Sequence, residues 1–317
     1  MPENSEFLDP HSKLPILVGP TGVGKSEVAY QWALRIGAEI ISADAFQVYR
    51  GTAVGTAQPS LEWQKKVPHH LIGSRDPKDN WNAVEFAQEA KAILEKGKAN
   101  AKNFIVVGGA GFYLRALVEG APAGASPDPE VRAMVSDKAL ELGKEGLHDW
   151  LKSRDPEAAA RLHPNDLQRV CRALEKTFDL SEKPAGLEPL GEDKVLFLGL
   201  ERSRENLDKI LLERSKAMWE GGLLDETRNL MELGLGEDHP LWGAIGYAEA
   251  AAHHKGEMTR AQALERIFRR TRQYAKRQWT WFKHQHNVEW INLDHYPTME
   301  SVLEELQKHI SPQMNTN

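Results

Sequence analysis

The chain has a single cysteine, Cys171, among its 317 residues, so it can form no internal disulfide and no cysteine-rich zinc site. It has no apolar run near the ~20 residues that a membrane-spanning helix needs. The first residues, 1–12, are polar and lack the apolar core of a secretory signal. We therefore expect a cytoplasmic protein without membrane association.

Acidic residues outnumber basic ones, and the net charge of −6 does not suit a protein that binds nucleic acid over its whole surface. The segment 266–283 is different, because it contains seven basic residues and no acidic residue, and the aromatic residues Trp279, Trp281 and Phe282 lie within it. Such a segment can hold a phosphate backbone locally, whereas the alternative is a charged helix face in solvent. The basic residues are Arg266, Arg269, Arg270, Arg272, Lys276, Arg277 and Lys283.

The strongest motif is GPTGVGKS at residues 19–26, between an apolar run at 14–18 and a helical pattern at 28–36. Glycines in this context let backbone N–H groups surround an anion, and the following helix N-terminus adds positive charge. Lys25 adds a full charge, and Ser26 offers a hydroxyl for Mg²⁺. We predict a diphosphate or triphosphate site formed by Gly19, Pro20, Thr21, Gly22, Val23, Gly24, Lys25 and Ser26.

Apolar runs alternate with helical patterns along most of the chain, which predicts a parallel sheet with helical crossovers. We expect strands at 14–18, 39–42, 69–72, 104–107, 195–200 and 288–291. Residues 120–126 have a linker composition, and residues 129–178 have a helical pattern throughout. The fold class is therefore predicted as α/β: a P-loop core of residues 1–119 and 191–317, interrupted by a helical insertion at 120–190.

Asp44 follows the second expected strand, at the sheet edge where ligands of parallel α/β folds collect. The expected strand at 104–107 ends in Gly-Gly-Ala, without the carboxylate that nucleotide hydrolases commonly use to hold Mg²⁺. This pattern favours a loop that holds a diphosphate leaving group over one that hydrolyses ATP. Asp44 is predicted to be a general base or metal ligand, the alternative being a cap for the next segment.

Further segments resemble the tRNA dimethylallyltransferases in order and spacing over residues 14–290. They read EIISADAFQVYRGTAVGTAQP from residue 39, VPHHLI from 67, VGGAGFYLRAL from 107, DPEVR from 128, HPNDLQRVCRALE from 163, AIGY from 244 and TRQYAKRQWTWFK from 271. The chain is most similar to bacterial members that lack a C-terminal zinc finger. The family combines a P-loop core with a helical insertion that grips the anticodon arm of tRNA.

The resemblance implies transfer of a dimethylallyl group from dimethylallyl diphosphate to N6 of the adenosine 3′ of the anticodon, with Mg²⁺ as cofactor. It implies that Asp44 is the catalytic base, that Thr21 lies near the scissile C–O bond and that Ser26 lies on the metal side. We expect a monomer. The implied tRNA contacts are Asp44, Ala45, Phe46, Gln47, Ala110, Arg132, Gln168, Arg169, Val170, Cys171, Arg172, Lys276 and Arg277.

The chain departs from the family's motifs at Ala45, Gln58, Ala110 and Ala248, where hydroxyl or basic side chains are usual. Each lost contact would weaken diphosphate or tRNA binding by ~1–3 kcal/mol. Three alternatives stay open: an enzyme for free adenine nucleotides, a tRNA-binding paralogue with weak or no transfer, and a P-loop NTPase or small-molecule kinase. For Cys171, the alternative to a tRNA contact is a small buried hydrophobic residue.

Overall fold

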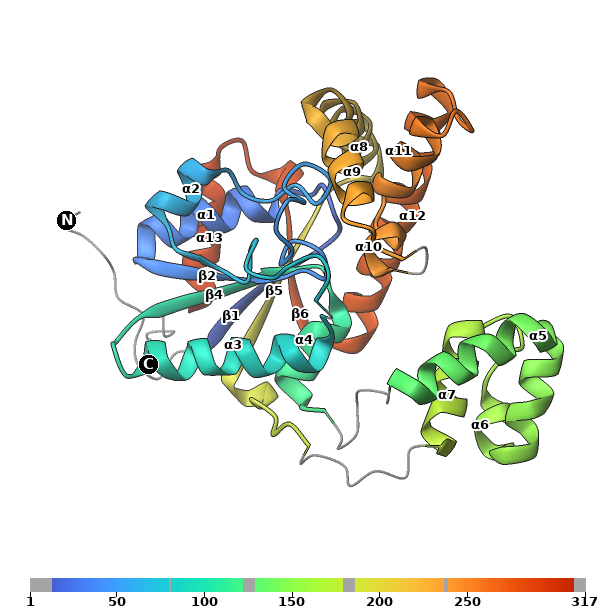
Figure 1. The fold of residues 1–317 in the computed structure, drawn as a ribbon. Helices are drawn as coiled ribbons and strands as arrows, with labels where there is room; N and C mark the ends of the chain where they lie inside the picture. Colours follow the sequence, from blue (N-terminus) through green and yellow to red (C-terminus); the bar gives the residue numbers. More distant parts are fainter. Residues whose placement is uncertain (1–12, 80, 122–128, 179–185, 237–238, 311–317) are drawn as a thin grey trace. The chain divides into compact units, whose positions relative to one another are not determined.

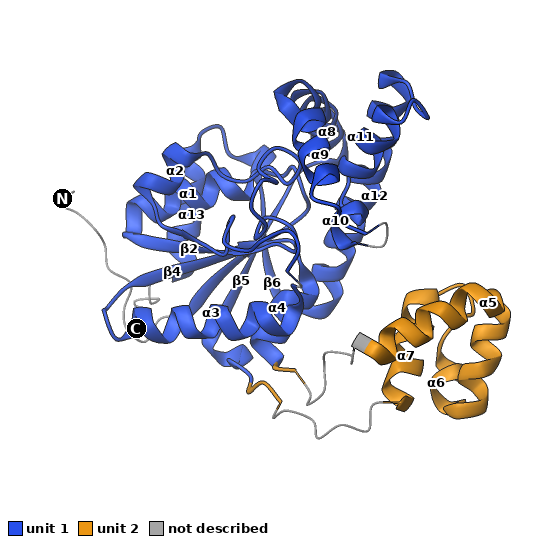
Figure 2. Cartoon of the chain, viewed as in Figure 1, with its two compact units in different colours: residues 1–119, 189–317 blue, residues 120–188 orange. Residues whose placement is uncertain are grey.

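The structure is a computed structural model, and it describes residues 13–79, 81–121, 129–178, 186–236 and 239–310. The chain divides into two compact units, shown in different colours in Figure 2. Unit 1 comprises residues 1–119 and 189–317, and unit 2 comprises residues 120–188. Most of the expected linker at 120–126 lies outside the described residues.

Unit 1 is built on a six-stranded parallel sheet with the strand order β3-β2-β4-β1-β5-β6. The strands are β1 (Leu14–Val18), β2 (Ala38–Ala43), β3 (His69–His70), β4 (Asn103–Gly108), β5 (Val195–Glu201) and β6 (Val288–Asn292). Strands β1, β2, β4 and β5 are largely buried, which explains why the sequence shows them as continuous apolar runs. The predicted α/β class and all six predicted strands are confirmed, although β3 is shorter than expected.

Helices cover both faces of the sheet (Figure 1). On one face lie α1 (Lys25–Ile36) and α13 (Met299–Ile310), and on the other lie α3 (Ala83–Lys98) and α4 (Gly111–Glu119). Trp32 of α1 and Leu306 of α13 pack with Ile105 of β4 and Leu198 of β5 in one apolar cluster. This packing fixes the ends of the strands, from which the loops of the site emerge. The shorter elements are α2 (Leu61–Lys66), η1 (Glu192–Lys194) and η3 (Leu293–His295).

A second group of helices follows β5 and lies together beside the sheet (Figure 1). It consists of α8 (Arg204–Met218), the π-helical turn η2 (Trp219–Leu223), α9 (Leu224–Glu232), α10 (Pro240–Gly243), α11 (Tyr247–His254) and α12 (Arg260–Gln285). The α12 helix carries the basic segment. The fully buried carboxylate of Glu249 forms ion pairs with Arg266 at 3.3 Å and with Arg270 at 2.6 Å. Arg272 pairs with Asp208 at 3.1 Å, so three of the seven basic residues stabilise unit 1 itself.

Unit 2 contains α5 (Pro129–Arg154), α6 (Pro156–Arg161) and α7 (Leu167–Phe178), so the helical pattern predicted for residues 129–178 is confirmed. Gly143, at φ +64°, interrupts α5. The three helices bury Val135, Leu151, Val170 and Leu174 in a core of their own. Across the described parts of both units, no helix combines the length and the apolarity needed to cross a membrane.

Candidate active site

A cavity of about 330 Å³ in unit 1 lies among the phosphate loop, the ends of β2 and β4, and helices α8 and α12. The predicted site residues that line it are Thr21, Gly22, Gly24, Lys25, Ser26, Asp44 and Gln47. Other polar residues also line it, among them His69, Arg214 and Tyr274, which the sequence did not predict, and Gln278 of the basic segment. The structure therefore brings Asp44 and the phosphate loop to the same cavity.

The phosphate loop owes its shape to glycines and to one lysine. Gly22 and Gly24 have φ values of +80° and +112°, which side chains with a Cβ rarely adopt. The Lys25 ammonium group donates to the carbonyl oxygens of Gly19 at 2.9 Å and Pro20 at 2.8 Å, so it braces the loop from within. The side chain of Val23 does not line the cavity. It is fully buried in the apolar cluster formed by α1, α13 and the strands.

Two partly buried cations, Lys25 and Arg214, and one carboxylate, Asp44, dominate the electrostatics of the cavity. Burial, and next the neighbouring Arg214, lower the pKa of Lys25 to about 7, while Asp44 opposes this shift. Burial also lowers the pKa of Arg214, again opposed by Asp44. An anion bound among these groups would relieve the repulsion between the cations, so the cavity is suited to a phosphorylated ligand.

The lowered pKa of Lys25 predicts that binding of a diphosphate takes up a proton. At pH 8 a lysine with a pKa of about 7 is mostly neutral, and a bound anion moves its pKa back toward 10.5, so Lys25 gains a proton. We expect an uptake of nearly one proton with pyrophosphate at pH 8, disappearing below about pH 6 where Lys25 is already charged. Calorimetry in buffers of different ionisation enthalpy measures this number. Lys25→Arg cannot titrate in this range and should lack the uptake; equal uptake in both proteins would assign it to another group.

Asp44 follows β2 and shapes the turn after it. Its Oδ1 accepts the backbone N–H groups of Phe46 at 2.9 Å and Gln47 at 3.2 Å, so the capping role considered as an alternative is present. The same side chain lines the cavity. Because the turn engages Oδ1, it orients the carboxylate without requiring Oδ2. The cap and the predicted chemical role are therefore compatible.

The glycines that end β4 explain how Asp44 reaches the phosphate loop, although β4 lies between β2 and β1. A Cβ on Gly108 would lie 2.0 Å from the carbonyl oxygen of Ala43, and a Cβ on Gly109 would lie 2.0 Å from Nε2 of Gln278. Gly108 therefore needs to be glycine, whereas a Cβ at Gly109 would push the end of the Gln278 side chain aside. The end of β4, which carries no carboxylate, lines the cavity with glycines that have no side chain. Asp44, which follows β2, and the phosphate loop, which follows β1, therefore face the same space.

The loop between β2 and α2 is held by two glutamines. The Gln47 side chain accepts the hydroxyl of Ser42 at 2.9 Å and donates to the carbonyl of Thr56 at 3.1 Å. Nε2 of Gln58 donates to the carbonyls of Gln47 at 2.8 Å and Tyr49 at 3.1 Å. The departure at Gln58 thus supplies hydrogen bonds that close the loop.

A buried contact ties this loop to the helices after β5. The Glu226 carboxylate accepts the backbone N–H groups of Val54 at 2.9 Å and Gly55 at 2.7 Å. It also accepts the hydroxyl of Tyr247 at 2.7 Å, and the pKa of this phenol is raised by burial and by Glu226, which keeps the donor protonated. Tyr247 belongs to the AIGY motif, which therefore positions a loop of the site.

Gly55→Ala is expected to destabilise unit 1, because the added Cβ would lie 2.4 Å from the Tyr247 ring. Overpacking of this kind costs ~1–3 kcal/mol. Chemical denaturation measures the loss. The control is Gly243→Ala, whose Cβ would meet no atom within 4 Å. Equal stability of the two variants would contradict the packing of Tyr247 against this loop.

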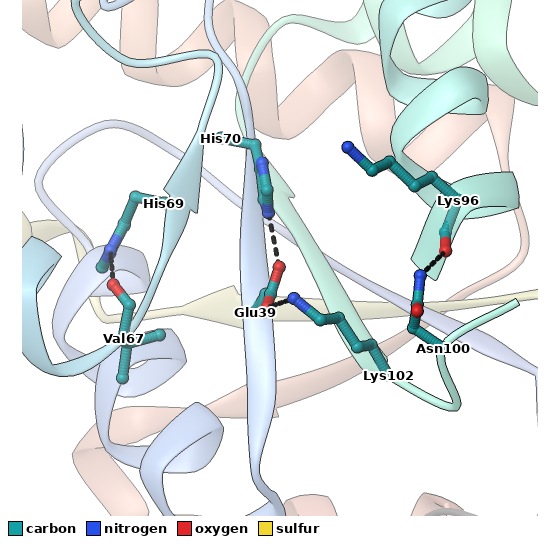
Figure 3. Close-up of polar contacts among 7 residues, drawn as sticks. All are labelled: Glu39, Val67, His69, His70, Lys96, Asn100 and Lys102. Carbon is teal, nitrogen blue, oxygen red and sulfur yellow. Dashed lines mark hydrogen bonds and ion pairs between the residues drawn. The ribbon is translucent and has the colours of Figure 1, made fainter. Parts of the chain in front are cut away.

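The adjacent histidines of β3 face different partners (Figure 3). Nε2 of His70 lies 2.7 Å from Glu39, which also pairs with Lys102. Nδ1 of His69 lies 2.7 Å from the carbonyl of Val67, and because a carbonyl only accepts, this nitrogen carries the proton. Burial lowers the pKa of His69, so the ring is neutral and its Nε2 is an acceptor on a residue that lines the cavity.

The other predicted tRNA contacts lie outside the cavity lining. Ala45 and Phe46 belong to the Asp44 turn, and the Ala110 carbonyl accepts the N–H groups that begin α4. Lys276 and Arg277 are exposed on α12. In unit 2, Arg132, Gln168 and Arg169 are exposed, while Cys171 and Arg172 are partly buried. Val170 corrects the prediction, because its fully buried side chain packs in the unit 2 core and has no surface to offer RNA.

Comparisons with known proteins agree on one family. The family model described as IPP transferase matches residues 47–285. A tRNA dimethylallyltransferase of Geobacter metallireducens is 41% identical over 88% of this chain and 92% of its own length. The solved tRNA isopentenylpyrophosphate transferase of Bacillus halodurans aligns with a TM-score of 0.67 and 32% identity, over 94% of this chain and 97% of that one. A eukaryotic dimethylallyltransferase, solved acting on tRNA, aligns with a TM-score of 0.70 and 27% identity, over 94% and 78%. The chain belongs to the IPP transferase family.

Proposed function

We propose that this protein transfers a dimethylallyl group from dimethylallyl diphosphate to N6 of the adenosine 3′ of the anticodon in tRNA. The observation that supports the proposal is that the phosphate loop, Arg214 and Asp44 line the same cavity. Its cations and backbone N–H groups suit a departing pyrophosphate, whose charge needs fixed positive groups. The names of the relatives give the reaction class.

Asp44 supplies the base that this reaction needs. The N6 lone pair is delocalised into the adenine ring, so attack is easier when a base takes the proton. As the N6–C1 bond to the allyl group forms and the C1–O bond breaks, the proton passes from N6 to Asp44 and pyrophosphate leaves. Thr21 also lines the cavity, and we place its hydroxyl near the oxygen of the breaking bond.

We propose Mg²⁺ as the cofactor. Magnesium prefers oxygen ligands and commonly uses one or two protein groups together with substrate phosphates. Ser26 and Asp44 bring a hydroxyl and a carboxylate to the same cavity, so the residues fit this ion, and Ser26 is the residue that we expect to hold it. When bound, Mg²⁺ would neutralise part of the charge of the departing pyrophosphate.

The tRNA would use surfaces on both units of a cytoplasmic monomer. We propose that unit 2 grips the anticodon arm through the exposed side chains of Arg132, Gln168 and Arg169, with Arg172 beside them. Lys276 and Arg277 on α12 would hold backbone phosphates. The target adenosine must leave its stack to enter the cavity, which costs a few kcal/mol.

The test is mass spectrometry of tRNA nucleosides after reaction with purified protein, dimethylallyl diphosphate and Mg²⁺. We expect isopentenyladenosine in tRNAs with an A-rich anticodon loop. AMP is included as a competing acceptor. Product on AMP alone would favour the free-nucleotide enzyme, and tRNA binding without product would favour the binding paralogue. Steady ATP hydrolysis without prenyl transfer would favour the NTPase.

A further inference from the structure

Gln278 is a buried amide within the basic segment of α12. Its side chain is 6% exposed, whereas the neighbouring Lys276 and Arg277 are exposed. A buried carboxamide needs hydrogen-bond partners for both of its ends. Oε1 accepts the backbone N–H of Thr21 at 2.8 Å, and Nε2 donates to the carbonyl of Gly109 at 3.0 Å. Because an N–H only donates and a carbonyl only accepts, these partners fix the orientation of the amide.

The contact with Thr21 is unusual for a phosphate loop, in which backbone N–H groups turn toward the anion. Here the N–H of Thr21 is directed at a side chain from α12, far along the sequence. This bond sets the plane of the peptide before Thr21, and so the direction in which the Thr21 side chain leaves the backbone. Thr21 itself lines the cavity.

Two neighbours surround the Gln278 side chain. Tyr274, one turn earlier in α12, lies on the same helix face and also lines the cavity. Gly109 provides the space, since a Cβ at this position would lie 2.0 Å from Nε2. The phosphate loop, the end of β4 and α12 thus meet at one carboxamide.

We propose that Gln278 is a positioning residue: it keeps the Thr21 N–H away from the bound diphosphate and thereby holds the Thr21 hydroxyl beside the bond that breaks. The rate part of this inference rests on the proposed transfer reaction, whereas the binding part does not. The α12 helix, which presents Lys276 and Arg277 to RNA, therefore also sets the geometry of the phosphate loop.

Gln278→Met removes both hydrogen bonds at nearly constant volume, and exposed Gln273→Met on the same helix is the matched control. In Gln278→Met we expect kcat at saturating substrates to fall at least about tenfold, because small misplacements of reacting groups are costly. We expect the Kd for inorganic pyrophosphate to change less than about threefold, because the released Thr21 N–H can turn to the anion. Gly109→Ala displaces the carboxamide from its other side. It should likewise lower kcat while changing the Kd for pyrophosphate little.

Amide NMR of protein labelled with ¹⁵N-threonine tests the proposal without any transfer reaction. In the natural protein, the Thr21 amide signal should shift little when pyrophosphate is added, whereas in Gln278→Met it should shift strongly. A Thr21 amide that responds equally in both proteins would overturn the proposal, as would a pyrophosphate affinity that falls in step with kcat. A natural protein that transfers nothing would defeat the proposed function, and the NMR comparison would still decide the role of Gln278.

Discussion

Asp44→Asn is expected to slow prenyl transfer by about 10²–10⁴-fold, the usual contribution of a positioned general base. The amide cannot take the N6 proton, yet its oxygen can still accept the N–H groups of Phe46 and Gln47 that now bond to Oδ1. The turn should therefore persist, and pyrophosphate binding should change little. Single-turnover rates with saturating donor and tRNA isolate the chemical step.

Asp44→Ala is the useful companion, because it removes the acceptor of the turn together with the base. It should lose stability as well as rate, whereas the asparagine variant should lose rate alone. Transfer by the asparagine variant at a rate near that of the natural protein would assign the base elsewhere, and the acceptor nitrogen of His69 would be the next group to test. Since Asp44 raises the pKa of Lys25, the asparagine variant should also lower the pH at which Lys25 loses its proton.

Lys25→Met is expected to weaken pyrophosphate binding about 100-fold or more. A hydrogen bond from a charged donor contributes ~1.5–3 kcal/mol, and the partly buried ammonium group also supplies a charge that no water molecule replaces. Calorimetry at pH 6, where Lys25 is charged, gives the largest difference from the natural protein.

The methionine variant also loses the donors to Gly19 and Pro20, so its thermal unfolding must be compared with that of the natural protein. Lys96→Met, at an exposed position of α3 outside the cavity lining, controls for the loss of one positive charge. If Lys25→Met binds pyrophosphate as tightly as this control, the backbone N–H groups and Arg214 carry the site without Lys25.

The elements that could be predicted are those whose hydrophobic pattern in the sequence matches the burial of their side chains in the fold. β1, β4 and β5 are apolar throughout because helices cover both faces of the sheet, and the phosphate loop is recognisable because its glycines meet a backbone requirement. The α13 helix was not predicted, although it buries Val302, Leu303 and Leu306 against α1. The sequence does carry the amphipathic pattern of this helix, since Val302, Leu303, Leu306 and Ile310 recur at helical spacing, so this helix could also have been predicted.

Arg214 shows why part of the site was missed. It lies in α8 among other charged residues, and nothing local separates it from Arg204 or Lys209, which are mostly exposed. Only the tertiary fold buries its guanidinium group beside Lys25. The reverse holds for Gln58, where a missing charge predicted a lost contact and the folded loop uses the amide for its own closure.

The ion pairs inside unit 1 limit how strongly α12 can respond to salt. Three of the seven basic residues of its segment 266–283, Arg266, Arg270 and Arg272, already neutralise carboxylates. Within the described residues no acid is paired with the other four, which are Arg269, Lys276, Arg277 and Lys283. Each polynucleotide phosphate that a cation neutralises releases condensed counterions, with a log–log slope of about 0.7–0.9 per contact. The contribution of this segment should therefore saturate at a slope of about 3, whereas counting all seven of its basic residues would suggest about 5 or 6.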